Sequence, residues 1–325
     1  MRCKPVLHLS LLPLLGLPLI LAAGCVRAAE KSPAERPLFA RTQDVVYGRK
    51  YGLALTLDVF KPQQHANGAA VIWVVSGGWF SSHDAISPQS ASSPINELAR
   101  RGYTVFAVVH SSQPKFTIPE ILQDMHLAVR YIRFHAADYQ IDPDRIGITG
   151  ASAGGHLSLM QGMVGDNGNT EAKAPIERVS SRVQAVACFY PPTDFLNYGK
   201  TGENALGRGI LKNFQAPFAF NEPDPHGGNS RAFVPITEEK RILEIGRQIS
   251  PLTHVTADDP PSLIIHGDKD TLVPMQQAEI IVAKLKEVGV PSQLMVKAGA
   301  GHGWANIGQD MPRIVDWFDK FLQKE

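Results

Sequence analysis

Cysteine is scarce in this chain, with three residues among 325. Cys3 and Cys25 lie near the amino terminus, which leaves Cys188 alone in the rest of the chain. A single cysteine can form neither an intramolecular disulfide nor a cysteine-based metal site. Cys188 lies inside the mostly apolar run over residues 183–189, so we expect a thiol packed inside a strand and not a nucleophile.

A large surplus of either charge is also missing. The formal net charge is +1, with 19% charged and 44% hydrophobic residues. Without a basic surplus to neutralise phosphates, nucleic acid is not an expected partner. The length and composition suit one large α/β domain or two small ones. No internal repeat or low-complexity segment stands out.

The amino terminus is the one place with a long apolar run, Val6–Ala23, preceded by basic residues and followed by small ones. This order predicts a signal peptide over residues 1–29 and an exported protein, periplasmic or secreted. Two alternatives stay open. One is a transmembrane anchor, against which the prolines inside the run argue. The other is a membrane-anchored lipoprotein with its lipid on Cys25, because the residues before it resemble a bacterial lipoprotein box.

Downstream, apolar runs alternate with segments of helical periodicity, which predicts a largely parallel sheet covered by helices on both faces. The run at 53–60 alternates at period two, as a half-exposed strand would, whereas 69–75 and 104–109 are continuously apolar, as central strands are. The expected strands are Leu53–Phe60, Ala69–Val75, Thr104–Val109, Arg145–Thr149, Val183–Phe189, Ser262–His266 and Ser292–Val296, and the expected helices are Ile118–Asp138, Met275–Val288 and Met311–Gln323.

Residues 195–250 interrupt this alternation with many glycines, asparagines and prolines. A short helix over Glu238–Gln248 is expected to close the segment. So long a departure from tight α/β connections is usually functional or mobile. We interpret it as a cap or lid inserted in a single domain over residues 40–325; a linker between two domains is the alternative.

The pentapeptide Gly150-Ala151-Ser152-Ala153-Gly154 follows an expected strand directly. Gly-x-Ser-x-Gly is typical of a sharp strand-to-helix turn that presents its serine outside the sheet. Glycines allow the unusual dihedrals and the close backbone approach. The helix that follows points its first amides at a reacting carbonyl. Ser152 is therefore the candidate nucleophile.

A serine nucleophile needs a base, and that base needs a carboxylate to orient it. His302, flanked by glycines, follows the strand expected at 292–296, while Asp268 and Asp270 follow the strand expected at 262–266. Open α/β sheets bind ligands at the carboxyl ends of their strands. The order serine, aspartate, histidine is that of an α/β-hydrolase triad. From the residues alone, both aspartates are candidates for the acid.

The oxyanion site is expected after the strand at 69–75, where the chain reads Val75-Ser76-Gly77-Gly78-Trp79. Consecutive glycines let backbone N–H groups face a tetrahedral oxyanion without a side chain in the way. The prediction is that Gly77, Gly78 and Ala153 donate their amides to the oxyanion.

These segments resemble the His-Gly-Gly-Gly-Trp class of α/β-hydrolase esterases, near the hormone-sensitive-lipase-like and bacterial acetyl-xylan and feruloyl-esterase-like branches. The resemblance covers roughly residues 45–325 outside the insertion and implies an eight-stranded sheet, small-molecule or carbohydrate ester substrates, and neither metal nor organic cofactor. It favours Asp270 as the acid and leaves Asp268 to tighten the turn. The segments that carry it are Val75–Trp79, Ile141–Ile146, Gly150–Leu157, His266–Pro274 and Gly299–Trp304.

Two departures from that family pattern stand out. Val75 and Ser76 replace its histidine and first glycine, so the hydrogen bonds that support this loop must differ. Ala151 replaces the acidic residue often found before the serine. His156, in the helix after Ser152, is expected to pack and not to react. Two rival functions stay open: a serine peptidase of the prolyl-oligopeptidase type, and a catalytically silent binding protein. No oligomeric state is predicted.

Overall fold

The computed structural model describes residues 37–90, 93–224, 226 and 232–324. The expected signal peptide and Cys25 lie outside the described residues. Pro37–Glu325 form one compact unit. Within the described ranges, no helix combines the length and the apolar character needed to cross a membrane.

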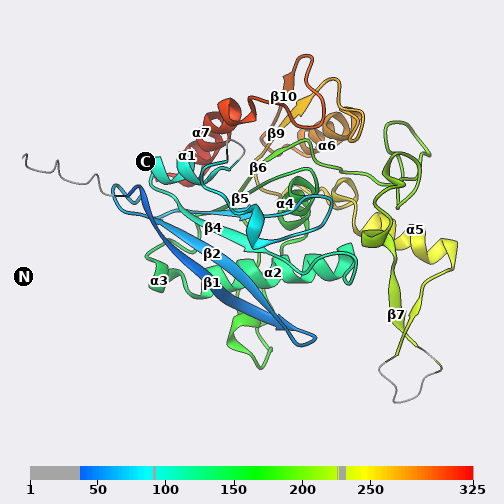
Figure 1. The fold of residues 1–325 in the computed structure, drawn as a ribbon, viewed down its shortest axis with the longest axis horizontal. Helices are drawn as coiled ribbons and strands as arrows, with labels where there is room; N and C mark the ends of the chain where they lie inside the picture. The colour runs from blue at the N-terminus through cyan, green and yellow to red at the C-terminus, as the bar shows by residue number, and fades with distance from the viewer. Residues whose placement is uncertain (1–36, 91–92, 225, 227–231, 325) are drawn as a thin grey trace, which may run out of the picture. The chain divides into compact units, whose positions relative to one another are not determined.

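Eight strands form one sheet (Figure 1): β1 (Phe39–Lys50), β2 (Leu53–Pro62), β3 (Ala70–Val74), β4 (Thr104–Val109), β5 (Ile146–Ala151), β6 (Ala185–Phe189), β9 (Ser262–Gly267) and β10 (Ser292–Lys297). Their order across the sheet is β1-β2-β4-β3-β5-β6-β9-β10. The β1–β2 and β2–β4 pairs are antiparallel, and the other neighbours are parallel. The expectation of a mostly parallel eight-stranded sheet is confirmed.

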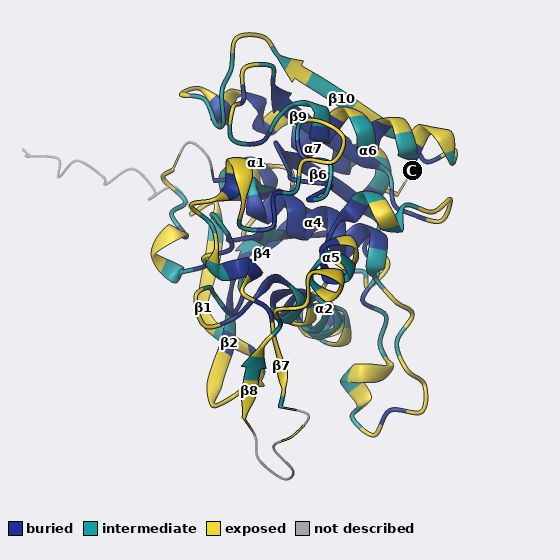
Figure 2. Ribbon diagram, turned by 90° about the vertical axis from the view of Figure 1, so that its right-hand side faces the viewer, coloured by how far each residue is buried: buried dark blue, intermediate teal, exposed yellow. Residues whose placement is uncertain are grey.

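Helices cover both faces of this sheet (Figure 2). They are α1 (Ile95–Arg100), α2 (Ile118–Phe134), α3 (Ala136–Tyr139), α4 (Ala153–Val164), α6 (Gln276–Glu287) and α7 (Met311–Leu322). Apolar side chains of α2, α4 and α6 bury against one face, and those of α1 and α7 against the other. Since successive residues of a strand point to opposite faces, the neighbours Val71 and Ile72 of β3 belong to different apolar clusters.

The sequence located the central strands well and the first two strands less well. β4 has the expected bounds, and the other expected strands agree within two residues. The half-exposed pattern expected for residues 53–60 is wrong at its end, because Leu57–Phe60 are all buried. Asp58 occupies one of these positions, with its carboxylate 2.5 Å from the Arg41 guanidinium. Strand β1 was not expected, since most of its residues are polar and exposed on the sheet edge.

Between β6 and β9 the chain forms the segment at 195–250, called the insertion below. It contains the short 3-10 helices Gly209–Leu211 and Ala216–Phe218, then the antiparallel pair β7 (Asn221–Pro223) and β8 (Phe233–Pro235), and then α5 (Glu239–Gln248). The helix expected to close this segment is thus present, and it begins one residue later than predicted. Figure 1 shows β7 and α5 at one side of the sheet.

Candidate active site

The turn between β5 and α4 holds Ser152 at φ 55° and ψ −119°, a backbone conformation that L side chains rarely adopt. Glycines permit it. A Cβ atom on Gly150 would lie 2.5 Å from the carbonyl carbon of Gly154, and one on Gly154 would lie 2.8 Å from the carbonyl oxygen of Val74. Strain of this kind concentrates at functional sites. Here it presents the Ser152 hydroxyl at the carboxyl ends of the parallel strands.

The structure brings together the three residues expected to form the triad. The His302 Nε2 atom lies 2.9 Å from the Ser152 hydroxyl oxygen, and its Nδ1 atom lies 2.8 Å from Asp270 Oδ2. His302 follows β10 and Asp270 follows β9, so the three groups come from three parallel strands that end at one edge. The Asp270 carboxylate is fully buried, while the His302 side chain is 22% exposed. This arrangement can pass a proton from Ser152 to His302.

Asp270 is held by several donors at once. Its Oδ1 atom accepts hydrogen bonds from the amides of Leu272 and Val273 at 2.9 and 2.8 Å. Its Oδ2 atom faces His302 and lies 3.4 Å from His266 Nε2. Burial alone would raise its pKa, but hydrogen bonds from His266, His302 and the Val273 amide hold the pKa of Asp270 well below its usual range. The carboxylate is therefore ionised beside His302.

Asp268 has a different position. Its Oδ1 atom accepts a hydrogen bond of 2.7 Å from the Gly299 amide, which ties the loop after β9 to the loop after β10. The structure gives it no contact with His302. Asp268 thus bridges two loops, and Asp270 is the aspartate that contacts His302.

The loop after β3 is a two-residue hairpin. The Gly77 amide donates to the Phe80 carbonyl at 2.9 Å, and the Phe80 amide donates back at 3.0 Å. Gly78 and Trp79 between them have φ values of 56° and 59°, as the central residues of a type I′ turn require. The prediction for Gly77 therefore needs correction, because its N–H is already used and is not available to an oxyanion.

Three other amides are open at this site. Within the described residues, the N–H groups of Gly78, Trp79 and Ala153 make no hydrogen bond. The centre of a two-residue turn leaves both of its N–H groups outside the turn's own bonds. Ala153 is the first residue of α4, where backbone donors have no partner inside the helix. These amides are of the type that stabilises a tetrahedral oxyanion.

Ser76 and His110 provide support for this loop that the sequence did not reveal. His110 Nδ1 donates to the Ser111 carbonyl at 2.5 Å, and its Nε2 atom lies 2.9 Å from the Ser76 hydroxyl. Burial lowers the pKa of His110 to about 4, so the ring is neutral and Nε2 accepts from Ser76. In the sequence, the indication of this contact was limited to a histidine directly after an apolar strand. Its partner Ser76 lies 34 positions earlier.

His156 supports the same loop from the other side. Its Nδ1 atom accepts a hydrogen bond of 3.1 Å from the Trp79 indole, and its Nε2 atom donates to the Ile249 carbonyl at 2.7 Å. The ring is fully buried, which lowers its pKa to about 4. The expectation that His156 packs is confirmed, and the packing links the end of the insertion to Trp79.

Aromatic side chains of the insertion surround Trp79. Its ring centroid lies 5.3 Å from Phe218, 5.8 Å from Phe195 and 6.5 Å from Phe214. A Cβ atom on Gly78 would lie 2.7 Å from the Phe214 ring, so this phenylalanine packs directly on the turn. The insertion is thus docked on the loop that carries the open amides.

Tyr190 is a further residue of the site that sequence reasoning missed. It follows β6 at φ 35°, and its ring meets the His302 imidazole edge to face with centroids 4.6 Å apart. Burial raises the pKa of Tyr190 to about 12. Its position directly after an apolar strand was the available signal, but nothing in the sequence distinguishes it from a core aromatic.

One group of described residues has the spacing of metal ligands: Asp44, Asp58 and His83. Two of its three members already have partners outside the group. Asp58 accepts from the Arg41 guanidinium, and His83 Nε2 lies 2.7 Å from the Thr56 hydroxyl. None of these residues belongs to the triad, and the set carries no argument for a metal.

Comparison with known proteins identifies a matching family model and curated relatives. The BD-FAE family model matches residues 57–285. The probable carboxylic ester hydrolase LipM of Mycobacterium tuberculosis is 29% identical over 252 residues, covering 77% of this chain and 53% of LipM. Esterase LipQ of the same organism is 29% identical over 254 residues, covering 77% and 54%. The chain therefore spans about half the length of these curated relatives.

Among solved structures, a truncated carbohydrate esterase from gut microbiota superposes with a TM-score of 0.68 at 26% sequence identity. The match covers 89% of this chain and 99% of that one. The α/β-hydrolase fold and the resemblance to its esterases are thereby confirmed.

Proposed function

Because this chain belongs to the BD-FAE family of α/β-hydrolases, we propose that it hydrolyses carboxylic esters through an acyl-enzyme formed on Ser152. The observation that carries the proposal is the chain of two hydrogen bonds from Ser152 through His302 to Asp270. The similarity to LipM, LipQ and a carbohydrate esterase supports an ester as the substrate.

In the first step the Ser152 oxygen attacks the ester carbonyl while His302 Nε2 takes the hydroxyl proton. The buried, ionised Asp270 keeps the other imidazole proton on Nδ1 and stabilises the imidazolium that forms. His302 then returns the proton to the leaving alcohol. Water attacks the acyl-enzyme in the same way, with His302 again acting as the base, and releases the acid.

The negative charge of the tetrahedral intermediate needs donors that are already in place. We assign this role to the amides of Gly78, Trp79 and Ala153, with Trp79 replacing the predicted Gly77. In related acyl-transfer chemistry, one such donor is worth roughly 3 kcal/mol of transition-state stabilisation. Ser76, held by His110, and the Trp79 indole, held by His156, fix the loop before substrate arrives.

The substrate class we propose is a small-molecule or carbohydrate ester. Hydrolysis of acetyl, butyryl, octanoyl and feruloyl esters by the wild type, with Ser152→Ala as the blank, tests the activity and ranks the acyl groups. An aminopeptide substrate in the same series tests the peptidase alternative. Faster turnover of the peptide than of every ester would replace the esterase proposal by the peptidase one.

A fluorophosphonate probe separates an enzyme from a silent binding protein. We expect covalent labelling of the folded wild type and none of Ser152→Ala, because the probe requires a serine activated by a base. A folded wild type that does not react would contradict the esterase proposal and favour the binding protein.

We also propose that the protein is exported, on the basis of the amino-terminal pattern at residues 1–29. Expression of the full chain in a bacterial host, followed by fractionation, tests this. Recovery outside the inner membrane with the first 29 residues removed is the expected result. Retention in membranes that Cys25→Ser abolishes would instead identify the lipoprotein alternative, and an uncleaved protein inside the cell would contradict export.

A further inference from the structure

Segment 110–113, directly after β4, contacts the loop that carries the open amides at three places. The first contact is the bond between the Ser76 hydroxyl and the His110 imidazole. In the second, the Gln113 amide donates to the Trp79 carbonyl at 3.2 Å. Both bonds end on residues next to the amide of Gly78 or on Trp79 itself, so they act close to the oxyanion donors.

Ser112 makes the third contact through its side chain. Its hydroxyl oxygen accepts a hydrogen bond from the Ser81 amide at 2.7 Å and donates to the Ser81 carbonyl at 3.0 Å. Bonds of this kind fix a loop only if the segment that provides them is itself held in place. The position of the oxyanion donors therefore depends on what holds segment 110–113.

Asp124, on the buried side of α2, holds this segment at Ser111. Its Oδ2 atom accepts hydrogen bonds from the Ser111 amide at 2.9 Å and from the Ser111 hydroxyl. The Asp124 side chain is 1% exposed. A buried amide and a buried hydroxyl each need an acceptor, and a single carboxylate oxygen serves both. Asp124 thus fixes Ser111 through its backbone and through its side chain.

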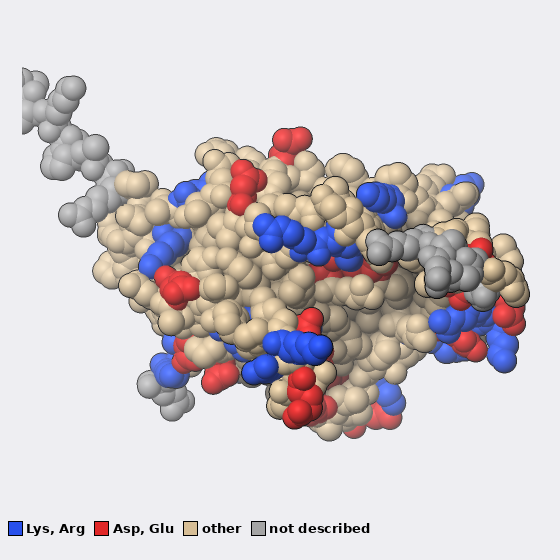
Figure 3. Space-filling view, turned by 90° about the horizontal axis from the view of Figure 1, so that it is seen from below, with Lys and Arg blue, Asp and Glu red and all other residues tan. Residues whose placement is uncertain are grey.

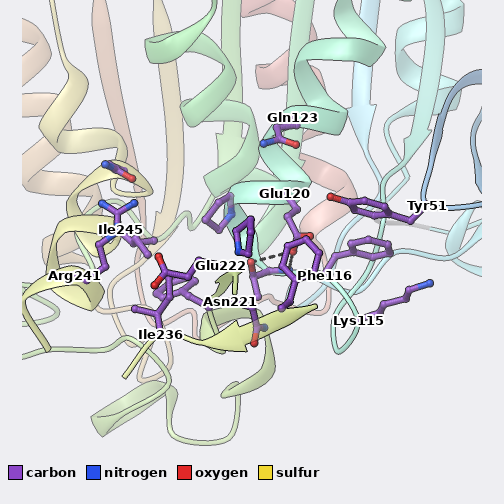
Figure 4. A pocket seen from close by; sticks show the side chains of 16 residues that line it. Tyr51, Lys115, Phe116, Glu120, Gln123, Asn221, Glu222, Ile236, Arg241 and Ile245 are labelled. Atoms are coloured by element: carbon purple, nitrogen blue, oxygen red, sulfur yellow. Dashed lines mark hydrogen bonds between the residues drawn. The ribbon is translucent and has the colours of Figure 1, made fainter. Parts of the chain in front are cut away.

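The other oxygen of Asp124 forms an ion pair with Lys50, the last residue of β1. The Lys50 ammonium also donates to the Glu120 carbonyl at 2.6 Å and lies 5.4 Å from the centroid of the Phe116 ring. Figure 4 shows Glu120 and Phe116 in the wall of a cavity beside α2, a wall to which Lys50 does not contribute. Lys50 therefore balances the charge of the buried Asp124 carboxylate.

This ion pair differs from the charged groups on the surface. Figure 3 shows basic and acidic side chains interspersed on one face of the molecule, and exposed pairs contribute little to stability. The pair of Lys50 and Asp124 is buried, and burying two charges has a desolvation cost that an apolar pair of similar volume avoids. A gain in stability therefore does not explain the pair, whereas Ser111 needs the acceptor that it provides.

We propose that Asp124, with Lys50 as its counter-ion, is a positioning residue for ester hydrolysis. It holds Ser111, and segment 110–113 in turn holds the amides that stabilise the oxyanion. The inference rests on the proposed function, to which it adds a residue outside the triad. Because the oxyanion amides act on charge that develops in the transition state, loss of the Asp124 acceptor lowers kcat and leaves KM nearly unchanged.

Two double variants separate the acceptor from the charge. Lys50→Met/Asp124→Asn and Lys50→Met/Asp124→Leu both lack the ion pair, and asparagine and leucine are similar in size. Only asparagine can still accept from Ser111. On p-nitrophenyl acetate, kcat of the asparagine variant should stay within about fivefold of the wild type, and kcat of the leucine variant should fall by about a hundredfold. KM should change by less than about threefold in both.

Asp259→Leu is the matched control. Asp259 is buried and accepts the amide and the hydroxyl of Thr256, as Asp124 does for Ser111. It precedes β9, however, and so lies at the opposite end of the strands from Ser152. Its kcat should stay within about threefold of the wild type. Equal values of kcat in the two double variants, or an equal loss in Asp259→Leu, would overturn the inference.

Hydrogen exchange provides a readout that needs no turnover. The amides of Gly77 and Phe80 are bonded within the hairpin, and the Ser81 amide is bonded to Ser112. These amides should exchange roughly tenfold faster in the leucine variant than in the asparagine variant, because a loop that is held less firmly opens more often. Equal exchange rates in the two folded variants would contradict a hold on the loop.

Asp124→Asn alone replaces the leucine variant if circular dichroism shows that the latter does not fold. With Lys50 present, position 124 faces an ammonium on one side and the Ser111 donors on the other. The NH₂ group of asparagine must then face one of them. We expect the same loss of kcat and the same faster exchange, and wild-type values of both would overturn the inference.

The failure of this inference differs from the failure of the proposed function. Equal kcat and equal exchange in the two double variants of an active esterase would eliminate the positioning role and leave the esterase in place. A wild type that hydrolyses no ester, but whose loop exchanges faster when position 124 loses its acceptor, would retain the hold on the loop and eliminate the esterase.

Discussion

At the scale of single residues, the two aspartates after β9 differ in what their oxygens contact. Asp270 is buried, accepts two backbone amides and faces His302, whereas Asp268 bridges to the Gly299 amide at the surface. An asparagine at either position keeps the shape of the side chain. Only at position 270 does it remove the negative charge that selects the His302 tautomer and stabilises its cation.

We therefore expect Asp270→Asn to lower kcat by a factor on the order of 10⁴, and Asp268→Asn to change it by less than about tenfold. Initial rates on p-nitrophenyl acetate, with circular dichroism to verify folding, measure both. If the two variants lost activity in the reverse order, Asp268 would be the acid and the assignment would be wrong.

Tyr190 offers a second test of this kind. Its ring packs on His302, but within the described residues its hydroxyl makes no hydrogen bond. Tyr190→Phe keeps the ring and should leave kcat near that of the wild type. Tyr190→Ala removes the ring and should lower kcat by roughly ten- to a hundredfold, because small displacements of catalytic groups have effects of that size. A large loss in Tyr190→Phe would instead indicate a role for the hydroxyl.

At the scale of elements, the hairpin after β3 gives the adjacent glycines Gly77 and Gly78 different backbone conformations and different surroundings. A Cβ on Gly77 would have nothing within 4 Å, and its φ is not in the left-handed region. Gly78 has φ 56°, and a Cβ there would collide with the Phe214 ring. A methyl group at position 78 must therefore distort the turn, while one at position 77 fits.

Gly78→Ala should consequently reduce kcat by about a hundredfold, the scale of losing one oxyanion donor. Gly77→Ala is the matched control and should stay within a few-fold of the wild type. Steady-state kinetics on p-nitrophenyl acetate compare the two. Equal losses would mean that Gly77 acts directly, as the sequence had predicted.

The same hairpin shows where prediction from the sequence succeeds and where it ends. Ser152, Asp270 and His302 follow apolar runs, and strand periodicity locates the ends of such runs within two residues. The use of the Gly77 amide depends instead on a turn type that places Trp79 at positive φ, which tryptophan seldom adopts. His110 reaches Ser76 only because β3 and β4 are neighbours in the sheet. Contacts of this kind follow from the topology and leave no local pattern.

At the scale of the whole molecule, two buried neutral histidines hold the oxyanion loop from opposite sides. His110 contacts Ser76 and His156 contacts Trp79. Burial lowers the pKa of each from 6.5 to about 4. Asp124 and Lys50 lie near His110 with opposite effects, while the Ile249 carbonyl faces His156. A protonated ring can no longer accept its hydrogen bond from Ser76 or from the Trp79 indole. We therefore expect low pH both to disturb the oxyanion loop and to lower the stability of the whole protein.

The sign of the resulting pH dependence follows from linkage. Above pH 6.5 both rings are neutral in the folded and the unfolded chain, and their contribution to stability is complete. As the pH falls from about 6.5 to about 4, the unfolded chain binds a proton at each ring while the folded chain does not. The free energy of unfolding should then fall by up to about 1.4 kcal/mol per pH unit for each histidine.

Urea unfolding at pH 7.0, 5.5 and 4.5 measures this slope. His110→Gln and His156→Gln should each reduce the slope by up to about 1.4 kcal/mol per pH unit, the contribution of one proton. Each variant should also be less stable at pH 7.0, because a polar group loses its hydrogen-bond partner. His65→Asn, at an exposed position, should keep the slope of the wild type. The same slope in all four proteins would show that neither buried ring resists protonation, and the acid response of the oxyanion loop would have to arise elsewhere.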